Sequence, residues 1–212
     1  MRNIPFFDTQ NGVASLVLKE IPYTQNAYIT VLDTQDLPTL LEECVSFCRV
    51  VGAERIYAKG HEDLHVYPQH MQVLQMEANT DPWPQTDAVM EPVTEETLNQ
   101  WCEIYNRRMV GVDNAAYMSI FDGRKMLASG EGYFIKQAGS PVAIVMAAEH
   151  KLNAVASIVS GGGRAALLSL KKTFGWERVL LEVASTNLRA ISLYKSLGFT
   201  QNQVISQWYK IV

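Results

Sequence analysis

Residues 154–174 contain a pattern that could bind an anion. The loop Ser160-Gly161-Gly162-Gly163-Arg164-Ala165 stands between an apolar run at 154–159 and a helical run at 166–174. Glycines let backbone N–H groups approach a phosphate closely, and the start of a helix adds partial positive charge. The pattern therefore predicts a strand, a glycine turn and a helix that together form an anion site.

A second block of interest follows the strand-like stretch at 178–183. Asn187 is suited to cap the start of a helix. Gly198 is placed to end that helix, and Phe199 to return the chain to the core. The apolar positions between them recur at helical spacing: Ala190, Ile191, Tyr194 and Leu197.

In this order, the two blocks resemble the GNAT superfamily of acyl-CoA N-acyltransferases. The residues that carry the resemblance are the glycine loop and the series Asn187, Ala190, Leu193-Tyr194 and Leu197-Gly198-Phe199. The resemblance implies an α/β fold of the α+β kind, with a mixed, mostly antiparallel central sheet flanked by helices. It also implies an N-acetyltransferase that uses acetyl-CoA as co-substrate. The acetyl group would pass to a primary amine by direct attack in a ternary complex.

The resemblance also assigns residues to the co-substrate. The pyrophosphate is expected on the glycine loop, and the pantetheine along the strand before it. Asn187 matches a position that commonly contacts the cofactor. The expected cofactor-binding residues are Ser157, Ile158, Val159, Ser160, Gly161, Gly162, Gly163, Arg164, Ala165 and Asn187.

Two catalytic residues are expected. Tyr194 matches the tyrosine assigned as general acid to the departing sulfur, and a phenol is protonated at neutral pH; core packing beside Phe199 is the structural alternative. Glu149 is the expected base, because a carboxylate near the cleft mouth can deprotonate an ammonium group. His150 is the second candidate, and both residues could instead be hydrated strand ends. Glu182 is expected to be structural.

The loop departs from the family pattern in two ways. The family usually places Gln or Arg at the start of the loop, where this chain has Ser160, or Ile158 in another register. The helix expected from Ala165 to Phe174 is about one turn shorter than usual. These departures keep open a second function, that of a non-catalytic acyl-CoA-binding or regulatory module.

The pentapeptide His61-Glu62-Asp63-Leu64-His65 matches the HExxH pattern of zinc peptidases. A zinc hydrolase through His61, Glu62 and His65 is therefore a third alternative. That chemistry needs both histidines on one face of a stable helix and a third ligand, yet Pro68 limits any helix here. Solvent-exposed loop histidines are the favoured interpretation, and no metal site is expected.

The composition excludes several classes of protein. The 212 residues carry a net charge of −4, which argues against a nucleic-acid partner and suits a cationic acceptor, either a small-molecule or a peptide amine. Cys44, Cys48 and Cys102 show no disulfide framework and are expected to be reduced core thiols of a cytoplasmic protein. The segment starting at Met1 lacks the long apolar stretch of a signal peptide, and no run approaches membrane-spanning length. An oligomer is possible, but nothing in the sequence supports one.

The elements that must position these residues suggest two parts. Residues 1–80 are expected to form a degenerate GNAT-like half domain, 81–87 a linker containing Pro82-Trp83-Pro84, and 88–212 the acyltransferase domain. Two helices, starting at Thr94 and around Asn114, are expected to wall the acceptor cleft. The second is expected to run to about Leu127, with a possible break at Gly123. After Phe199 only one strand fits, so the first half may cover the open sheet edge.

The first half resembles a diverged copy of the second. The stretch 52–57 parallels 175–180, Asn26-Ala27 parallels Asn153-Ala154, and Tyr67 falls near the position of Tyr194. Coincidental similarity of two βαβ units is the alternative. The first copy has Asp33-Thr34-Gln35-Asp36 in place of the glycine loop, so it is expected to bind no CoA.

Overall fold

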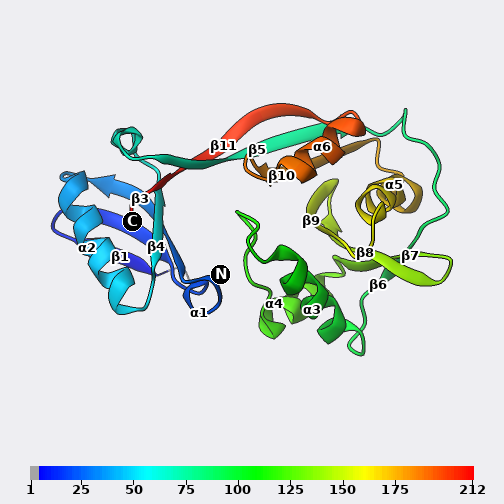
Figure 1. Cartoon of the computed structure of the whole chain (residues 1–212), viewed down its shortest axis with the longest axis horizontal. Coiled ribbons are helices and arrows are strands. Elements are labelled where there is room, and N and C mark those ends of the chain that lie inside the picture. Colours follow the sequence, from blue (N-terminus) through cyan, green and yellow to red (C-terminus); the bar gives the residue numbers. More distant parts are fainter. Residues whose placement is uncertain (1–4) are drawn as a thin grey trace. The chain divides into compact units, whose positions relative to one another are not determined.

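The computed structural model describes residues 5–212, so the first four residues of the expected N-terminal half lie outside it. The chain forms two compact units (Figure 1). One contains the described residues up to Val73 together with Val204–Val212, and the other contains Leu74–Gln203. Two strands, β5 (Gln69–Asn79) and β11 (Thr200–Lys210), contribute residues to both units.

The first unit is a sheet with one main helix. Its strands follow the order β1-β2-β3-β4-β11-β5, where the bounds of the first four are Phe6–Thr9, Gly12–Val17, Asn26–Thr34 and Arg55–Lys59. Helix α2 (Leu37–Val50) packs on β2 and β3 and buries Leu40, Leu41, Cys44 and Cys48 against one face of the sheet. The short helices α1 (Ile21–Thr24) and η1 (Glu62–Val66) lie in connections.

The second unit has a larger sheet in the order β11-β5-β10-β9-β8-β7-β6. The bounds of its own strands, from β6 to β10, are Val89–Pro92, Gly132–Gln137, Ser140–Ala148, Lys151–Ser157 and Arg178–Ala184. Neighbouring strands from β6 to β9 are antiparallel, whereas β9 and β10 are parallel. The mixed, mostly antiparallel sheet flanked by helices confirms the predicted fold class.

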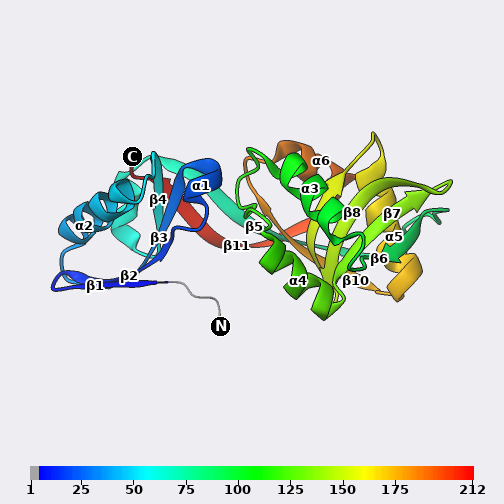
Figure 2. The ribbon, with the colours of Figure 1, turned by 90° about the horizontal axis from the view of Figure 1, so that it is seen from below.

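Helices cover both faces of this second sheet (Figure 2). α3 (Leu98–Met109) packs on β8 and β9 and also against α4 (Ile120–Ser129), around the fully buried Trp101. α5 (Gly162–Phe174) packs on the opposite face, in a core that includes Tyr194 of α6 (Leu188–Ser196). The two cores keep α5 and α6 separate from α3 and α4.

Three expected features of the helices need correction. α5 begins at Gly162 rather than Ala165, because two of the glycines are helical, so the helix is not shortened as expected. α4 begins at Ile120 rather than near Asn114 and is unbroken at Gly123, where a Cβ would lie 2.6 Å from Cys102 Sγ of α3. α3 begins at Leu98 with Thr97 as its N-cap, four residues later than expected from Thr94.

The expected domain boundaries differ from the two units. Residues 204–212, assigned by sequence to the second part, pair with β4 of the first unit through Tyr209 and Lys210. The expected linker at 81–87 is anchored, because Trp83 is buried and its Nε1 donates to the Leu197 carbonyl at 2.8 Å. Residues 74–80 also belong to the second unit.

The edge left open by the single C-terminal strand is filled from the first half of the chain. β5 lies between β10 and β11 in the second sheet, which confirms that the first half covers this edge. Glu77 of β5 forms an ion pair with Arg178 of β10, and its other carboxylate oxygen accepts from the Asn202 amide at 2.8 Å.

The repeat is visible in the strand pairing. β3 and β4 are parallel, as β9 and β10 are, and each pair flanks a helix that connects its strands. Asn26 lies opposite Arg55 at the start of β3, and Lys151 lies opposite Leu180 at the start of β9. The alignment of Asn26 with Asn153 stays a prediction.

The three cysteines are free and buried, which confirms the predicted core thiols. Burial raises the pKa of Cys44 to about 12 and that of Cys48 to about 11, so both stay protonated at neutral pH. Among residues 5–212, no helix is long and apolar enough to cross a membrane.

Candidate functional site

The parallel strands β9 and β10 form a fork. They pair at two positions, Leu180 with Lys151 and Leu181 with Leu152. β9 then continues to Ser157 and β10 to Ala184 without further pairing between them. Backbone groups on the inner edges of the two arms are thus left for another partner.

A β-bulge marks the base of this fork. The register between β8 and β9 shifts from Met146 opposite Ala154 to Ala147 opposite Leu152, which leaves Asn153 as the extra residue. A bulge disrupts the ladder locally and re-aims backbone groups, and bulges are frequent beside active sites. Asn153 is exposed and follows the last residue of β9 that pairs with β10.

The glycine loop lies at the open end of the fork, and each of its glycines has a structural reason. Gly161 is the N-cap of α5 with φ of 82°, a left-handed conformation that strongly favours glycine. A Cβ on Gly162 would collide with the carbonyl oxygen of Val142 in β8. A Cβ on Gly163 would lie 2.9 Å from both Leu193 Cδ2 and Ser157 Oγ.

The start of α5 presents unpaired donors. The N–H of Gly162 donates to the Val159 carbonyl at 3.1 Å, whereas those of Gly163 and Arg164 find no acceptor within residues 5–212. No side chain caps this helix and no acidic residue lies in its first turn. The exposed Arg164 forms no ion pair with a described residue, although a cation at a helix N-terminus is unfavourable by itself. These donors and this cation suit an anion.

The segment between β9 and the glycine loop is held by β8. The N–H groups of Ile158 and Val159 both donate to the Val142 carbonyl, at 2.9 and 3.3 Å. Ile158 and Ser157 are half-buried, while Val159 and Ser160 are exposed. The residues predicted to bind the cofactor, Ser157 to Ala165, thus form one continuous segment at the end of β9 and the start of α5.

Asn187 lies on the other arm of the fork, at the start of α6. Its side chain caps that helix by accepting from the Ala190 N–H at 3.1 Å, as its sequence position predicts. Its side-chain NH2 group makes no hydrogen bond with residues 5–212. One end of Asn187 therefore orients the helix, while the other can donate to a ligand.

Tyr194 is buried beside the fork. Its side chain is 6% exposed and packs against Phe199, with ring centroids 5.5 Å apart, in the same core as Val183 on the β10 arm. Its hydroxyl has no hydrogen-bond partner in residues 5–212. Burial raises the pKa of Tyr194 to about 12, so the phenol keeps its proton at neutral pH.

Glu149 and His150 are not brought together with the glycine loop. They form the two-residue turn between β8 and β9, with φ of 50° and 65°, at the end of β9 opposite to the loop. Glu149 is exposed, and the rise of a strand places it about 13 Å from Asn153 along the chain. The His150 ring packs on Trp176 at 5.2 Å.

Two polar contacts that sequence reasoning missed tie the α3 segment to the arms of the fork. Arg108 Nη2 donates to the Ile158 carbonyl at 2.6 Å, and Thr186 Oγ1 donates to Asp113 Oδ2 at 2.7 Å. Ile158 follows the β9 arm and Thr186 the β10 arm. Arg107-Arg108 in the sequence indicates only a helix C-terminus, so no local signal identifies these partners.

The HExxH segment forms a 3-10 helix rather than an α-helix. In such a helix side chains eclipse at a spacing of three, so positions 61 and 65 do not share a face. His61 Nδ1 accepts from the Asp63 N–H at 3.2 Å, and the His65 ring bonds to the Glu62 carbonyl. Residues 5–212 hold no group of three or more His, Cys, Asp or Glu side chains that could bind a metal ion.

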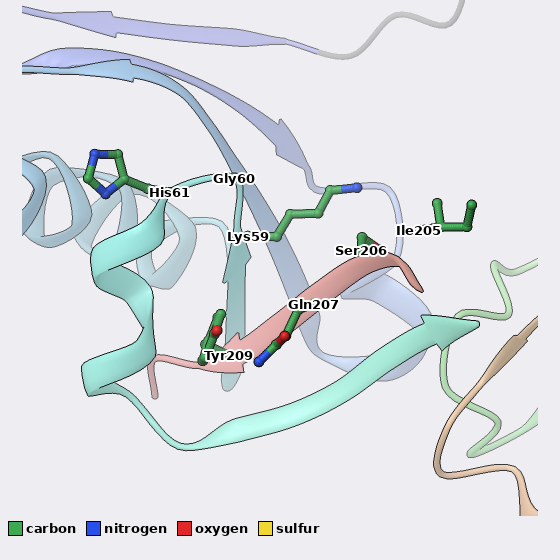
Figure 3. A pocket seen from close by; sticks show the side chains of 7 residues that line it. All are labelled: Lys59, Gly60, His61, Ile205, Ser206, Gln207 and Tyr209. Atoms are coloured by element: carbon green, nitrogen blue, oxygen red, sulfur yellow. The ribbon is translucent and has the colours of Figure 1, made fainter. Parts of the chain in front are cut away.

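A separate cavity of about 360 Å³ lies in the first unit, where β11 continues beyond the end of β4 (Figure 3). Its lining contains no residue of the predicted site. The Lys59 ammonium, which borders it, lies over the Trp208 ring at 4.8 Å. The candidate functional site is therefore the fork of the second unit.

Solved structures resemble this fold. No protein-family model matches the sequence, and no curated protein matches it either. A GCN5-related N-acetyltransferase from Sphaerobacter thermophilus has a TM-score of 0.55 at 10% identity, over 94% of this chain and 76% of its own. Another from Anabaena variabilis has a TM-score of 0.63 at 10% identity, over 94% and 59%. A tandem GNAT protein from the clavulanic acid biosynthesis pathway has a TM-score of 0.51 at 11% identity, over 94% and 78%.

The chain therefore has the fold of the GNAT superfamily, preceded by a smaller βαβ unit with a similar order of elements. At these low identities the likeness establishes the fold alone. The activity must be argued from the site.

Proposed function

We propose that the protein is an N-acetyltransferase that moves the acetyl group of acetyl-CoA to a primary amine. The observation that carries the proposal is the fork between β9 and β10, whose open end meets the uncapped N-terminus of α5. A fork of this kind offers strand edges to an amide-containing chain, and a helix N-terminus offers donors to a diphosphate. Pantetheine diphosphate combines both chemical features.

The residues at the site fit this co-substrate. The unpaired N–H groups of Gly163 and Arg164 and the guanidinium of Arg164 would hold the diphosphate. The arms of the fork would hold the pantetheine, with Ser157, Ile158 and Val159 on one side and the free amide of Asn187 on the other. Acetyl-CoA would supply an activated thioester, and the chain would supply the groups that bind it and transfer protons.

The acyl end would lie at the base of the fork, beside the bulge at Asn153. A backbone N–H freed there could donate to the oxygen that becomes negative as the amine attacks. Tyr194 would give its proton to the departing sulfur, and its raised pKa of about 12 keeps that proton in place at neutral pH before the reaction. The base proposed from sequence, Glu149, lies away from this position and needs its own test.

The second candidate function is that of an acyl-CoA-binding module without turnover. Ser160 at the start of the loop, where the resembling family usually has Gln or Arg, favours this candidate. The full-length α5 removes the other reason for it. We propose a cytoplasmic protein in either case, since its buried free thiols suit a reducing compartment.

Two measurements test the proposal. Titration with acetyl-CoA should raise the melting temperature, because a ligand that binds the native state stabilises it. Thiol release should then appear with at least one primary amine in a panel of an alkylamine, a polyamine, an amino acid and a short peptide with a free N-terminus. Binding without release from any of them would favour the module, and no binding would remove both candidates.

Tyr194→Phe tests the assigned acid. The substitution removes one oxygen from a buried ring, so the fold and the acetyl-CoA dissociation constant should be retained. The kcat should fall about 100-fold, as is typical when a general acid is lost. Steady-state thiol release together with isothermal titration would show both effects. An unchanged kcat would limit Tyr194 to packing beside Phe199.

A further inference from the structure

Lys151 and Glu182 form an ion pair where the fork begins. The Lys151 ammonium donates to Glu182 Oε1 at 2.6 Å. Lys151 belongs to one of the two paired positions, while Glu182 is the first residue of β10 beyond the last pair, opposite the bulge residue Asn153. The carboxylate therefore lies at the base of the fork, where the acyl end of the co-substrate is proposed to lie.

Glu182 faces the α3 side of the sheet. The residues on either side of it, Leu181 and Val183, point into the core beneath α5 and α6. Since side chains alternate along a strand, Glu182 points to the opposite face, on which Ala154 and Ala156 of β9 meet α3. Tyr194 belongs to the α5 and α6 side, so the phenol and the carboxylate approach the fork from opposite faces.

The carboxylate is accessible and only weakly needed for stability. The Glu182 side chain is 31% exposed and that of Lys151 is 43% exposed. Ion pairs of this exposure contribute little to stability. The main effect of the Lys151–Glu182 ion pair is therefore to fix the position of the Glu182 carboxylate, and a reacting group must be positioned in this way.

A cavity lies along β10 beside residues that precede Glu182. Leu180, two residues earlier on β10, lines a hollow of about 270 Å³ together with Glu77, His150, Glu177 and Arg178. Arg178 is paired with Glu77 and Lys151 with Glu182, which leaves the Glu177 carboxylate in excess. Such a surface favours a cationic ligand.

We infer that Glu182 is the base that takes a proton from the ammonium group of the acceptor, that Lys151 positions its carboxylate, and that the body of the acceptor lies in the adjoining cavity. The inference rests on the proposed function. One proton of the ammonium passes to Glu182 and then to water, and the amine attacks the thioester carbon. A C–N bond forms and the C–S bond breaks. The nitrogen loses its second proton to water, while Tyr194 gives its proton to the departing sulfur and regains one from water.

Several other charged groups surround this position and will contribute to any pH profile. Those on the same face or at the arms of the fork are Lys151, Arg178, Glu77, Glu177, His150, Arg108 and Asp113. A pH profile of the wild type alone therefore cannot assign the base. Variants must be compared over the whole pH range.

Glu182→Gln is the test, and Glu91→Gln is its matched control. Glu91 also forms a cross-strand ion pair with a lysine, Lys136, but between β6 and β7 and away from the fork. The pair of variants therefore separates the loss of an ion pair from the loss of a base. With acetyl-CoA and the best amine of the panel, E182Q should lower kcat/KM about 100-fold at neutral pH while the acetyl-CoA dissociation constant stays within about twofold. E91Q should leave both values within about twofold.

The pH dependence gives the sharper readout. The deficit of E182Q should be largest where the acceptor is an ammonium and should shrink above about pH 9, where free amine becomes abundant. Lys151→Gln should lower kcat/KM less than E182Q does, because it removes the positioning contact but keeps the carboxylate.

Each outcome is decisive. E182Q activity within about twofold of the wild type, or a loss that only follows weaker acetyl-CoA binding, would overturn the assignment of Glu182 and leave the proposed function standing. A wild-type protein that binds no acetyl-CoA would overturn both.

Discussion

The two copies of the central unit differ at the same two places. In the first, β3 and β4 pair at five positions from Asn26 to Thr30, whereas β9 and β10 in the second pair at only two. In the first, the helix after the parallel strand is capped by a carboxylate, whereas in the second it is capped by a glycine with no side chain. The first copy thus pairs its parallel strands fully and caps its helix with a side chain, whereas the second keeps an open fork and unpaired N–H donors.

The capping contact shows how the first copy is closed. Asp36 accepts from the Thr39 hydroxyl at 2.7 Å and from the Thr39 N–H at 3.1 Å, and these bonds lower the pKa of the Asp36 carboxyl. A carboxylate there occupies the place that a phosphate would take at a helix N-terminus. Both copies have the same order of elements. The difference therefore indicates that anion binding depends on which backbone N–H groups and strand edges the protein leaves without a hydrogen-bond partner.

The largest effect on this comparison should come from Gly162→Ala. The new Cβ would collide with the Val142 carbonyl of β8, a backbone atom that cannot move alone. Overpacking of this kind costs about 2 kcal/mol or more, and acetyl-CoA binding should be lost with the shift of α5. Urea unfolding would measure the loss of stability. Gly163→Ala is the matched control, because its Cβ would meet only the tips of Leu193 and Ser157, at 2.9 Å, so its cost should be smaller.

Gly161→Asp should make the second copy resemble the first. A carboxylate at the N-cap of α5 would accept from the donors proposed to bind the diphosphate and would repel it. The acetyl-CoA dissociation constant should rise about 100-fold by titration calorimetry. Gly161→Asn is the control for shape, since Asn tolerates the left-handed backbone but carries no charge. Equal effects of the two substitutions would show that a change in the backbone, and not the added charge, weakens acetyl-CoA binding.

Arg164→Ala should have a smaller effect, about tenfold on the acetyl-CoA dissociation constant. The residue supplies one charge-assisted contact at an exposed position, while the backbone N–H groups remain. The affinity of the variant should also depend less on salt concentration. Protein stability should be unchanged or slightly higher, because a cation at the start of α5 opposes the helix dipole. A binding constant equal to that of the wild type would remove Arg164 from the site.

Asp36→Ala should have the smallest effect, confined to stability. Because the carboxyl pKa is lowered in the folded state, the cap stabilises the protein above the ordinary value of 3.8 and is lost as the pH falls through the lower folded value. Melting temperatures of variant and wild type should thus differ at pH 7 and converge near pH 2. Acetyl-CoA binding should not change. A second acetyl-CoA bound in the variant would show that the cap alone closes the first copy.

Local patterns predicted the parts of the site that lie close together in the chain. The glycine loop, the cap at Asn187 and the strand before the loop each depend on neighbouring residues, and each lies where expected. Local pattern does not separate the two candidate bases, because Glu149 and Glu182 are both glutamates in or beside a strand. The structure places Glu149 in a turn and Glu182 on β10, one residue beyond its last pair with β9.

Long-range pairing explains the misplaced boundaries. Nothing near Val204 or Leu74 shows that β11 joins β4 or that β5 joins β10, because such partners are distant in sequence. The repeat is predicted from similar residues, and in both units the helix-connected strands pair in parallel.

The position of β5 has a consequence for any attempt to dissect the chain. A fragment starting at Ala88 would contain every residue proposed to bind acetyl-CoA, but it would lack Glu77 of the proposed acceptor cavity, the strand beside β10 and the indole that donates to the Leu197 carbonyl. Its exposed sheet edge would be prone to self-association. During synthesis the ribosome releases β5 long before β10 and β11 exist, so the second sheet can close only after β11 has emerged.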